Sequence, residues 1–171
     1  VREIPHTLPS VRFAVETALR SLKRGGEPQW SGGITINGLV WMDSAEGMIK
    51  QVDILVNKGF KTIKLKVGTL TLNEELEMLR EIGRKCPAEA FTIRIDANGA
   101  FGKDSGDGMT ALEKLVALSN ADLDIHSIEQ PIPAGQYDEM ATLCAASPIP
   151  IALDEELIGV NSHAERRALL E

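Results

Sequence analysis

Strand and helix signals alternate from residue 34 to the end of this 171-residue chain. Five short stretches rich in β-branched and apolar residues are typical of strands, at 34–42, 62–67, 91–96, 125–129 and 149–154. Apolar residues recur at helical spacing in the segments that follow them, at 45–59, 70–85, 108–118, 136–145 and 162–170. Strands that alternate with helices form parallel sheets joined by right-handed crossovers, so the sequence predicts an α/β fold.

Two parallel architectures fit this alternation, a (β/α)8 barrel and an open doubly wound sheet. A complete barrel needs about 250 residues, so this chain could hold only part of one, with about five strands. No G-x-G-x-x-G sequence follows any predicted strand, so the dinucleotide-binding form of the open sheet lacks its phosphate loop.

Each predicted strand has one apolar face and a second face that becomes polar toward its C-terminal end. In the stretch 91–96, Ile93 and Ile95 alternate with Arg94 and Asp96. A barrel strand needs such faces, because helices cover its outside and the chemistry gathers at one end of its interior. Strands of an open parallel sheet are usually apolar on both faces. The pattern therefore favours a partial (β/α)8, TIM-type barrel.

Charged side chains lie near the C-terminal ends of four successive strands, on the parity that we expect to face the interior. They are Lys64 and Lys66, then Arg94 and Asp96, then Glu129, then Asp154. Three crowded carboxylates repel one another unless a cation joins them, and hard oxygen ligands suit Mg²⁺ better than zinc. Each lysine of the i, i+2 pair disfavours the charge of the other, so one could act as a base near neutral pH. These groups predict proton abstraction beside a carboxylate, with the metal holding the enediolate that forms.

Taken singly, each of these features has a simpler explanation. A Lys-x-Lys pair is usually a solvated strand edge, and an acid after a strand is usually a turn or a helix cap. Their shared position at four strand ends is what favours a site. His126 falls on the outward parity, so we expect its imidazole to pack against helices.

Composition and net charge argue against some classes of binding partner. The chain has 18 basic and 25 acidic residues and a net charge of −7, which argues against nucleic acid and against an anionic membrane surface. No apolar run reaches the roughly 18 residues of a spanning helix, and no signal-peptide pattern opens the chain. Cys86 and Cys144 lie far apart and form no C-x-x-C motif, so neither a zinc site nor a redox pair is indicated, and we expect two reduced thiols. We expect a cytoplasmic protein that acts on a small molecule.

Four motifs resemble the successive motifs of the enolase superfamily, in its muconate-lactonizing-type branch. They are Lys64-Leu65-Lys66, Ile95-Asp96-Ala97-Asn98, Ile128-Glu129-Gln130-Pro131 and Leu153-Asp154-Glu155. The stretches 9–19, 36–42, 127–133 and 151–159 resemble the o-succinylbenzoate synthase family, of the Bacteroidetes-like type. The resemblance covers nearly the whole chain.

This resemblance implies a lyase of menaquinone synthesis that acts on a small carboxylate. The implied reaction is the syn dehydration of 2-succinyl-6-hydroxy-2,4-cyclohexadiene-1-carboxylate to 2-succinylbenzoate. Lys66 is the implied base that removes the proton α to the carboxylate and returns a proton to the leaving hydroxide, and Lys64 helps to bind the carboxylate and tunes Lys66. The same motifs serve dipeptide epimerases and N-acylamino acid racemases, which use both flanking lysines. A non-catalytic binding or assembly module is a third alternative.

The resemblance also implies a cofactor and a domain plan. Mg²⁺, with Mn²⁺ as an alternative, is the implied cofactor, and its implied ligands are Asp96, Glu129 and Asp154. Supporting roles fall to Arg94, Asn98 and Glu155. Residues 1–33 correspond to a linker and helix trailing from a capping domain, and residues 34–171 to the first part of the barrel domain. Most of the capping domain and the later barrel units, with a further lysine, are not in this sequence. We therefore expect these residues alone to be inactive, and we leave open a homo-oligomer for the full-length protein.

Overall fold

The computed structural model describes residues 4–5, 7–26, 32–102, 106–160 and 162–169. The chain divides into two compact units, Val1–Ile34 with Leu157–Glu171, and Thr35–Glu156. Every candidate site residue lies in the unit Thr35–Glu156. The predicted division between residues 33 and 34 into capping and barrel domains stays a prediction.

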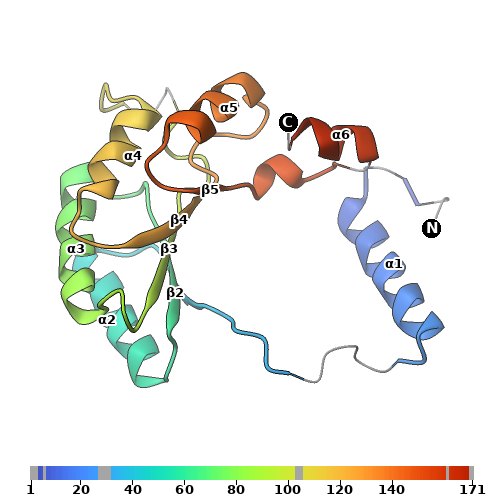
Figure 1. Ribbon diagram of the computed structural model, residues 1–171, viewed down its shortest axis with the longest axis horizontal. Coiled ribbons are helices and arrows are strands. Elements are labelled where there is room, and N and C mark those ends of the chain that lie inside the picture. Colours follow the sequence, from blue (N-terminus) through green and yellow to red (C-terminus); the bar gives the residue numbers. More distant parts are fainter. Residues whose placement is uncertain (1–3, 6, 27–31, 103–105, 161, 170–171) are drawn as a thin grey trace. The chain divides into compact units, whose positions relative to one another are not determined.

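The unit Thr35–Glu156 contains one parallel five-stranded sheet in which the strands are neighbours in chain order. The strands are β1 (Gly38–Val40), β2 (Thr62–Lys66), β3 (Thr92–Asp96), β4 (Ile125–Glu129) and β5 (Ile151–Ala152). Four helices connect them, namely α2 (Ala45–Asn57), α3 (Leu72–Lys85), α4 (Ala111–Ser119) and α5 (Tyr137–Ala146). Figure 1 shows α2, α3 and α4 on the same side of the strands. This uninterrupted order is that of a barrel, because doubly wound sheets reverse direction at a switch point. The predicted α/β fold is confirmed.

The unit Val1–Ile34 with Leu157–Glu171 is helical in its described part. It holds α1 (Pro9–Lys23) and α6 (His163–Ala168), and the 3-10 helix η1 (Glu155–Leu157) spans the boundary between the units. Helix α6 begins with a capping box, in which the side chain of Ser162 accepts from the N–H of Glu165 and the carboxylate of Glu165 accepts in return. None of the helices in the described residues is long and apolar enough to cross a membrane.

The predicted faces of β2 are confirmed. Ile63 and Leu65 are fully buried in the apolar core, whereas Lys64 and Lys66 lie on the opposite, partly exposed face. The helix-facing side supplies burial free energy, about 1.5–3 kcal/mol for each fully buried aliphatic side chain. The other face of the strand is therefore available for charged groups.

The two edge strands are shorter than the sequence predicts. The predicted strand 34–42 reduces to Gly38–Val40 and the predicted strand 149–154 reduces to Ile151–Ala152. Each edge strand pairs with one neighbour only, so residues beyond the last ladder hydrogen bond turn into loops. Asp154 therefore lies in a loop rather than on β5.

A bulge changes the faces of β4. The register steps from Ile93 opposite Ile125 to Arg94 opposite Ser127, which leaves His126 without a partner residue. His126 is exposed, and its Nδ1 lies 3.0 Å from Ser127 Oγ. The expectation of a packed imidazole is wrong, because the extra residue shifts the alternation of the strand.

Substitutions at two glycines, Gly68 and Gly59, test the packing of the loop that follows β2. Gly68 and Gly59 have φ of 91° and 87°, which strains any residue with a Cβ. A Cβ at Gly68 would lie 2.4 Å from the Cβ of Ala100, whereas one at Gly59 would meet nothing within 4 Å. Gly59→Ala should lower the free energy of unfolding by about 1–2 kcal/mol. Gly68→Ala should cost about 1–3 kcal/mol more, measured by urea unfolding, and equal losses would contradict this packing.

Candidate active site

The parallel register aligns the candidate residues at one end of the sheet. Lys66 lies opposite Asp96 in the β2–β3 pair, and Asp96 lies opposite Glu129 in the β3–β4 pair. Lys64 lies one pleat earlier on β2, on the same face as Lys66. Charged groups from three adjacent strands therefore meet at their C-terminal ends.

Two lysines and two acids form a direct cluster there. Lys64 Nζ lies 2.6 Å from Glu129 Oε1 and 2.8 Å from Asp96 Oδ2. Lys66 Nζ lies 2.6 Å from the same Asp96 Oδ2. The Asp96 side chain is only 1% exposed, and its Oδ2 contacts both ammonium groups. We call Lys64, Lys66, Asp96 and Glu129 the lysine–carboxylate cluster.

Asn98 and Glu155 extend the cluster toward the end of β5. Lys66 Nζ donates to Asn98 Oδ1 over 2.6 Å, and Asn98 Nδ2 donates to Glu155 Oε1 over 2.9 Å. Glu155 Oε2 is buried and accepts no hydrogen bond from the described residues. A buried carboxylate oxygen of this kind favours a positively charged or hydrogen-bonding neighbour.

The charges of the cluster stabilise one another. Burial alone would lower the pKa of Lys64, but the hydrogen bonds to Asp96 and Glu129 outweigh it and hold that pKa above its usual value. Burial alone would raise the pKa of Asp96, but hydrogen bonds from Lys64 and Lys66 outweigh it and hold that pKa below its usual value. For Lys64, the facing acids therefore outweigh the mutual repulsion of lysines on which the sequence argument relied.

Two predicted residues, Arg94 and Asp154, lie outside both this cluster and its extension through Asn98 and Glu155. Arg94 is exposed on β3, and Asp154 is exposed after β5, with its backbone N–H donating to Gln130 Oε1 over 3.1 Å. Among the described residues, no three His, Cys, Asp or Glu side chains are grouped closely enough to hold a metal ion. The expected convergence of Asp96, Glu129 and Asp154 is not present as a preformed set. Asp96 and Glu129 instead meet at the Lys64 ammonium.

The donors that are present nevertheless fit a hard divalent cation. Oxygens of Asp96 and Glu129 approach one cationic atom, Lys64 Nζ, so both acids can reach a single positive centre. The unpartnered buried oxygen of Glu155 lies at the end of the same hydrogen-bonded chain. Carboxylate oxygens of this kind are the ligands that Mg²⁺ and Mn²⁺ prefer.

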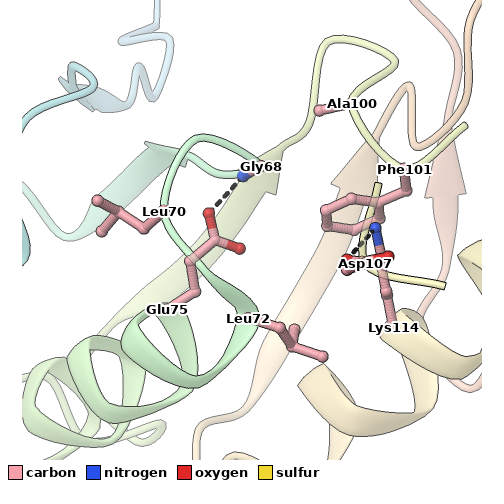
Figure 2. Close-up of a pocket in the computed structure, with 8 residues that line it drawn as sticks. All are labelled: Gly68, Leu70, Leu72, Glu75, Ala100, Phe101, Asp107 and Lys114. Carbon is pink, nitrogen blue, oxygen red and sulfur yellow. Dashed lines mark hydrogen bonds and ion pairs between the residues drawn. The ribbon is translucent and has the colours of Figure 1, made fainter. Parts of the chain in front are cut away.

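A buried acid that the sequence did not single out holds the loop after Lys66. Glu75 is 2% exposed, and its Oε1 accepts the backbone N–H of Gly68 and that of Thr69, the latter over 3.2 Å. Figure 2 shows Glu75 reaching from α3 to Gly68. In the sequence, Glu75 resembles any acid in the first turn of a helix, where the dipole favours it. Only the tertiary fold reveals its role.

A small cavity of about 130 Å³ lies beside Glu75. It is lined by Gly68, Leu70, Leu72, Glu75, Ala100, Phe101, Asp107 and Lys114. Lys114 is buried, with its Nζ 2.7 Å from Asp107 Oδ2 and 5.4 Å from the centre of the Phe101 ring (Figure 2). A buried cation thus lies near the buried Glu75 and offsets part of its desolvation.

Comparisons of this chain with known proteins agree on one family. Residues 47–168 match the family model described as Enolase C-terminal domain-like. The o-succinylbenzoate synthase of Desulfotalea psychrophila is 40% identical over 95% of this chain and 44% of its own length. The L-Ala-D/L-Glu epimerase of Bacillus subtilis is 30% identical over 92% of this chain and 44% of its own length.

A solved structure extends the likeness to three dimensions. The crystal structure of o-succinylbenzoate synthase from Thermosynechococcus elongatus BP-1, complexed with Mg in the active site, matches with a TM-score of 0.75 and 28% identity. The match covers 97% of this chain and 48% of that one. The chain therefore spans about half the length of these three relatives.

The pH dependence of stability tests the buried position of Glu75. Burial raises the pKa of Glu75 above its ordinary 4.5, although the loop N–H groups oppose the shift. A raised pKa means that the folded state holds the proton more tightly than the unfolded state. The stabilisation is thus full below pH 4.5 and is lost as the pH rises through the folded pKa.

Glu75→Gln should therefore gain stability relative to the parent protein as the pH rises through that window, measured by urea unfolding. Glu74→Gln is the matched control, because hydrogen bonds with Thr71 lower the pKa of the exposed Glu74. The control should lose stability relative to the parent as the pH rises. Slopes of the same sign for both variants would contradict this assignment.

Proposed function

This chain belongs to the enolase C-terminal domain-like family, and on that basis we propose that it supplies the base and acidic ligands of a magnesium-dependent dehydratase. The reaction is that of o-succinylbenzoate synthase, and the substrate is a small carboxylate. The observation that carries the proposal is the lysine–carboxylate cluster, in which Lys66 and Lys64 share one oxygen of Asp96. The 40% identity to a synthase of this name supports the choice of reaction.

In this mechanism Lys66, an ammonium in its ion pair with Asp96, first gives up one proton to solvent and then acts in its neutral amine form. Its Nζ takes the proton α to the substrate carboxylate, and the electrons of the broken C–H bond form an enediolate. The enediolate then collapses, the C–O bond to the hydroxyl group breaks, and the departing hydroxide takes the proton from Lys66 to leave as water. Lys66 returns to its starting form, so no oxidant or further reactant is needed.

The neighbours of Lys66 prepare it for this role. Asn98 Oδ1 and Asp96 Oδ2 each lie 2.6 Å from its Nζ and fix the direction of the amine. The charged Lys64 supplies a fixed positive group for the substrate carboxylate. Because both lysines extend from the same face of a β-strand, their spacing is set by the backbone and not by flexible loops.

Asp96, Glu129 and Asp154 would hold the cation, and Asp154 would join the other two through its loop. When bound, Mg²⁺ would stabilise the negative charge that develops on the carboxylate oxygens of the substrate. Arg94 and Glu155 remain supporting residues in this proposal. A role in menaquinone synthesis and a cytoplasmic location belong to the same proposal.

Epimerisation is the second candidate, because the L-Ala-D/L-Glu epimerase of Bacillus subtilis is 30% identical over 92% of this chain. Both reactions begin with proton abstraction at an α-carbon and differ in the fate of the enediolate, which loses hydroxide in one and regains a proton in the other. Exchange of that proton with deuterated solvent, without loss of water, would favour the epimerase. A purely binding or assembly role would require neither amine, and the intact lysine–carboxylate cluster argues against it.

Lysine replacement in the full-length protein tests the proposed function. Lys66→Ala should reduce the rate of 2-succinylbenzoate formation by about 10²–10⁴-fold or more, because the base is lost. Lys85→Ala is the control, since Lys85 forms a surface ion pair with Asp53 at 2.8 Å and should leave the rate unchanged. Dehydration that survives Lys66→Ala would remove the base assignment, and a parent protein with no dehydratase activity would overturn the proposed reaction.

A further inference from the structure

Gln130 contacts the C-terminal ends of β3, β4 and β5. The candidate cation ligands lie at these ends, with Asp96 on β3, Glu129 on β4 and Asp154 in the loop after β5. Gln130 follows Glu129 directly at the end of β4 and is fully buried. Its backbone N–H donates to Ala152 O of β5 over 2.9 Å, and its backbone carbonyl accepts the N–H of Gly99, after β3, over 2.7 Å. The backbone of one residue thus connects β4 with both of its neighbours.

The side chain of Gln130 makes the further connection to Asp154. Its Oε1 accepts the backbone N–H of Asp154 over 3.1 Å and that of Glu156 over 3.3 Å. Its Nε2 donates to Ile132 O over 3.0 Å and to Glu156 Oε2 over 3.3 Å. A primary amide has two donor hydrogens and two acceptor lone pairs, so its hydrogen-bonding capacity is used in full.

Glu156 completes this connection from the other side. It is 4% exposed, and its Oε1 accepts the backbone N–H of Gly135 over 2.9 Å. Glu156 thereby joins the loop after β5 to the connection between β4 and α5. A buried carboxylate is destabilising unless it is hydrogen-bonded, and both oxygens of Glu156 accept a hydrogen bond here.

The backbone of Gln130 is held in an uncommon conformation. Its φ is 40°, in the left-handed region that favours glycine. A non-glycine residue there is strained and persists only where its surroundings fix it. The six hydrogen bonds of Gln130 provide that constraint.

We propose that Gln130 is a positioning residue that holds the Asp154 loop beside Glu129 and so organises the cation site. This inference rests on the proposed function, because it takes Asp96, Glu129 and Asp154 as the cation ligands. Strand β5 has only two residues, so the ladder ends before Asp154 and cannot fix it. The amide of Gln130 reduces the loop freedom that cation binding would otherwise have to remove.

Mg²⁺ affinity of the full-length protein, measured by titration calorimetry, tests this role. Gln130→Met keeps the length of the side chain and removes its hydrogen bonds, and it should weaken Mg²⁺ binding by about 10–100-fold. Gln136→Met is the matched control, because Gln136 is half-buried in the same β4–α5 connection and donates only a long hydrogen bond of 3.4 Å to Pro133 O. The control should bind Mg²⁺ as the parent does.

Hydrogen exchange without Mg²⁺ provides a second measurement that does not depend on the cation. The amides of Asp154 and Glu156 should be protected in the parent and exchange at least about tenfold faster in Gln130→Met, because they lose their acceptor. Unchanged Mg²⁺ affinity or unchanged exchange in Gln130→Met would overturn this inference alone. A parent protein that fails to bind Mg²⁺ would overturn the proposed function.

A reciprocal exchange keeps the inference testable if Gln130→Met does not fold. Gln130→Glu retains the acceptor oxygens but removes the donor to Glu156 and places two carboxylates together, so it should weaken Mg²⁺ binding. The double variant Q130E/E156Q restores a donor and an acceptor at that contact and should recover at least about tenfold in affinity. Equal affinities for the single and double variants would also overturn the inference.

Discussion

The buried carboxylate of Asp96 is the group on which the rest of this site depends. A buried unpaired charge costs several kcal/mol, so Asp96 requires cations on the neighbouring strand. Lys64 and Lys66 supply them at 2.8 and 2.6 Å from the same oxygen. Because both lysines are fixed by the register of β2 against β3, correct strand pairing and correct charge pairing depend on each other. The same contacts place an amine beside acids that suit a divalent cation.

The loops after the strands are held by buried polar groups and not by apolar packing alone. Glu75 binds the backbone after β2, and Gln130 binds the backbone after β5. Asn98 and Gln130 both have positive φ, and they lie two residues and one residue beyond the ends of the acid-bearing strands β3 and β4. Strained residues are expected where a site must be rigid and the surroundings can fix them. The fold thus combines an apolar helix-facing layer with a polar end that is held in place.

The sequence predicts what depends on local periodicity and misses what depends on pairing. The burial of Ile63 and Leu65 opposite Lys64 and Lys66 follows from alternation along one regular strand. The exposure of His126 does not follow from alternation, because one bulged residue shifts the alternation of β4 and no local sequence signal marks the bulge. Motif spacing and parallel register are enough to predict that Lys66 lies beside Asp96 and Asn98. They do not predict the separate position of Asp154, because that position depends on where the β5 ladder ends.

The central claim is that Asp96, Glu129 and Asp154 can bind one divalent cation within reach of Lys66. A crystal structure of the full-length protein grown with Mg²⁺ tests it most directly. The account predicts one ion with oxygens of all three acids at about 2.0–2.1 Å, and Lys64 released from its bridge between Asp96 and Glu129. An ion bound elsewhere, or a Lys64 bridge that persists at saturating Mg²⁺, would contradict the account.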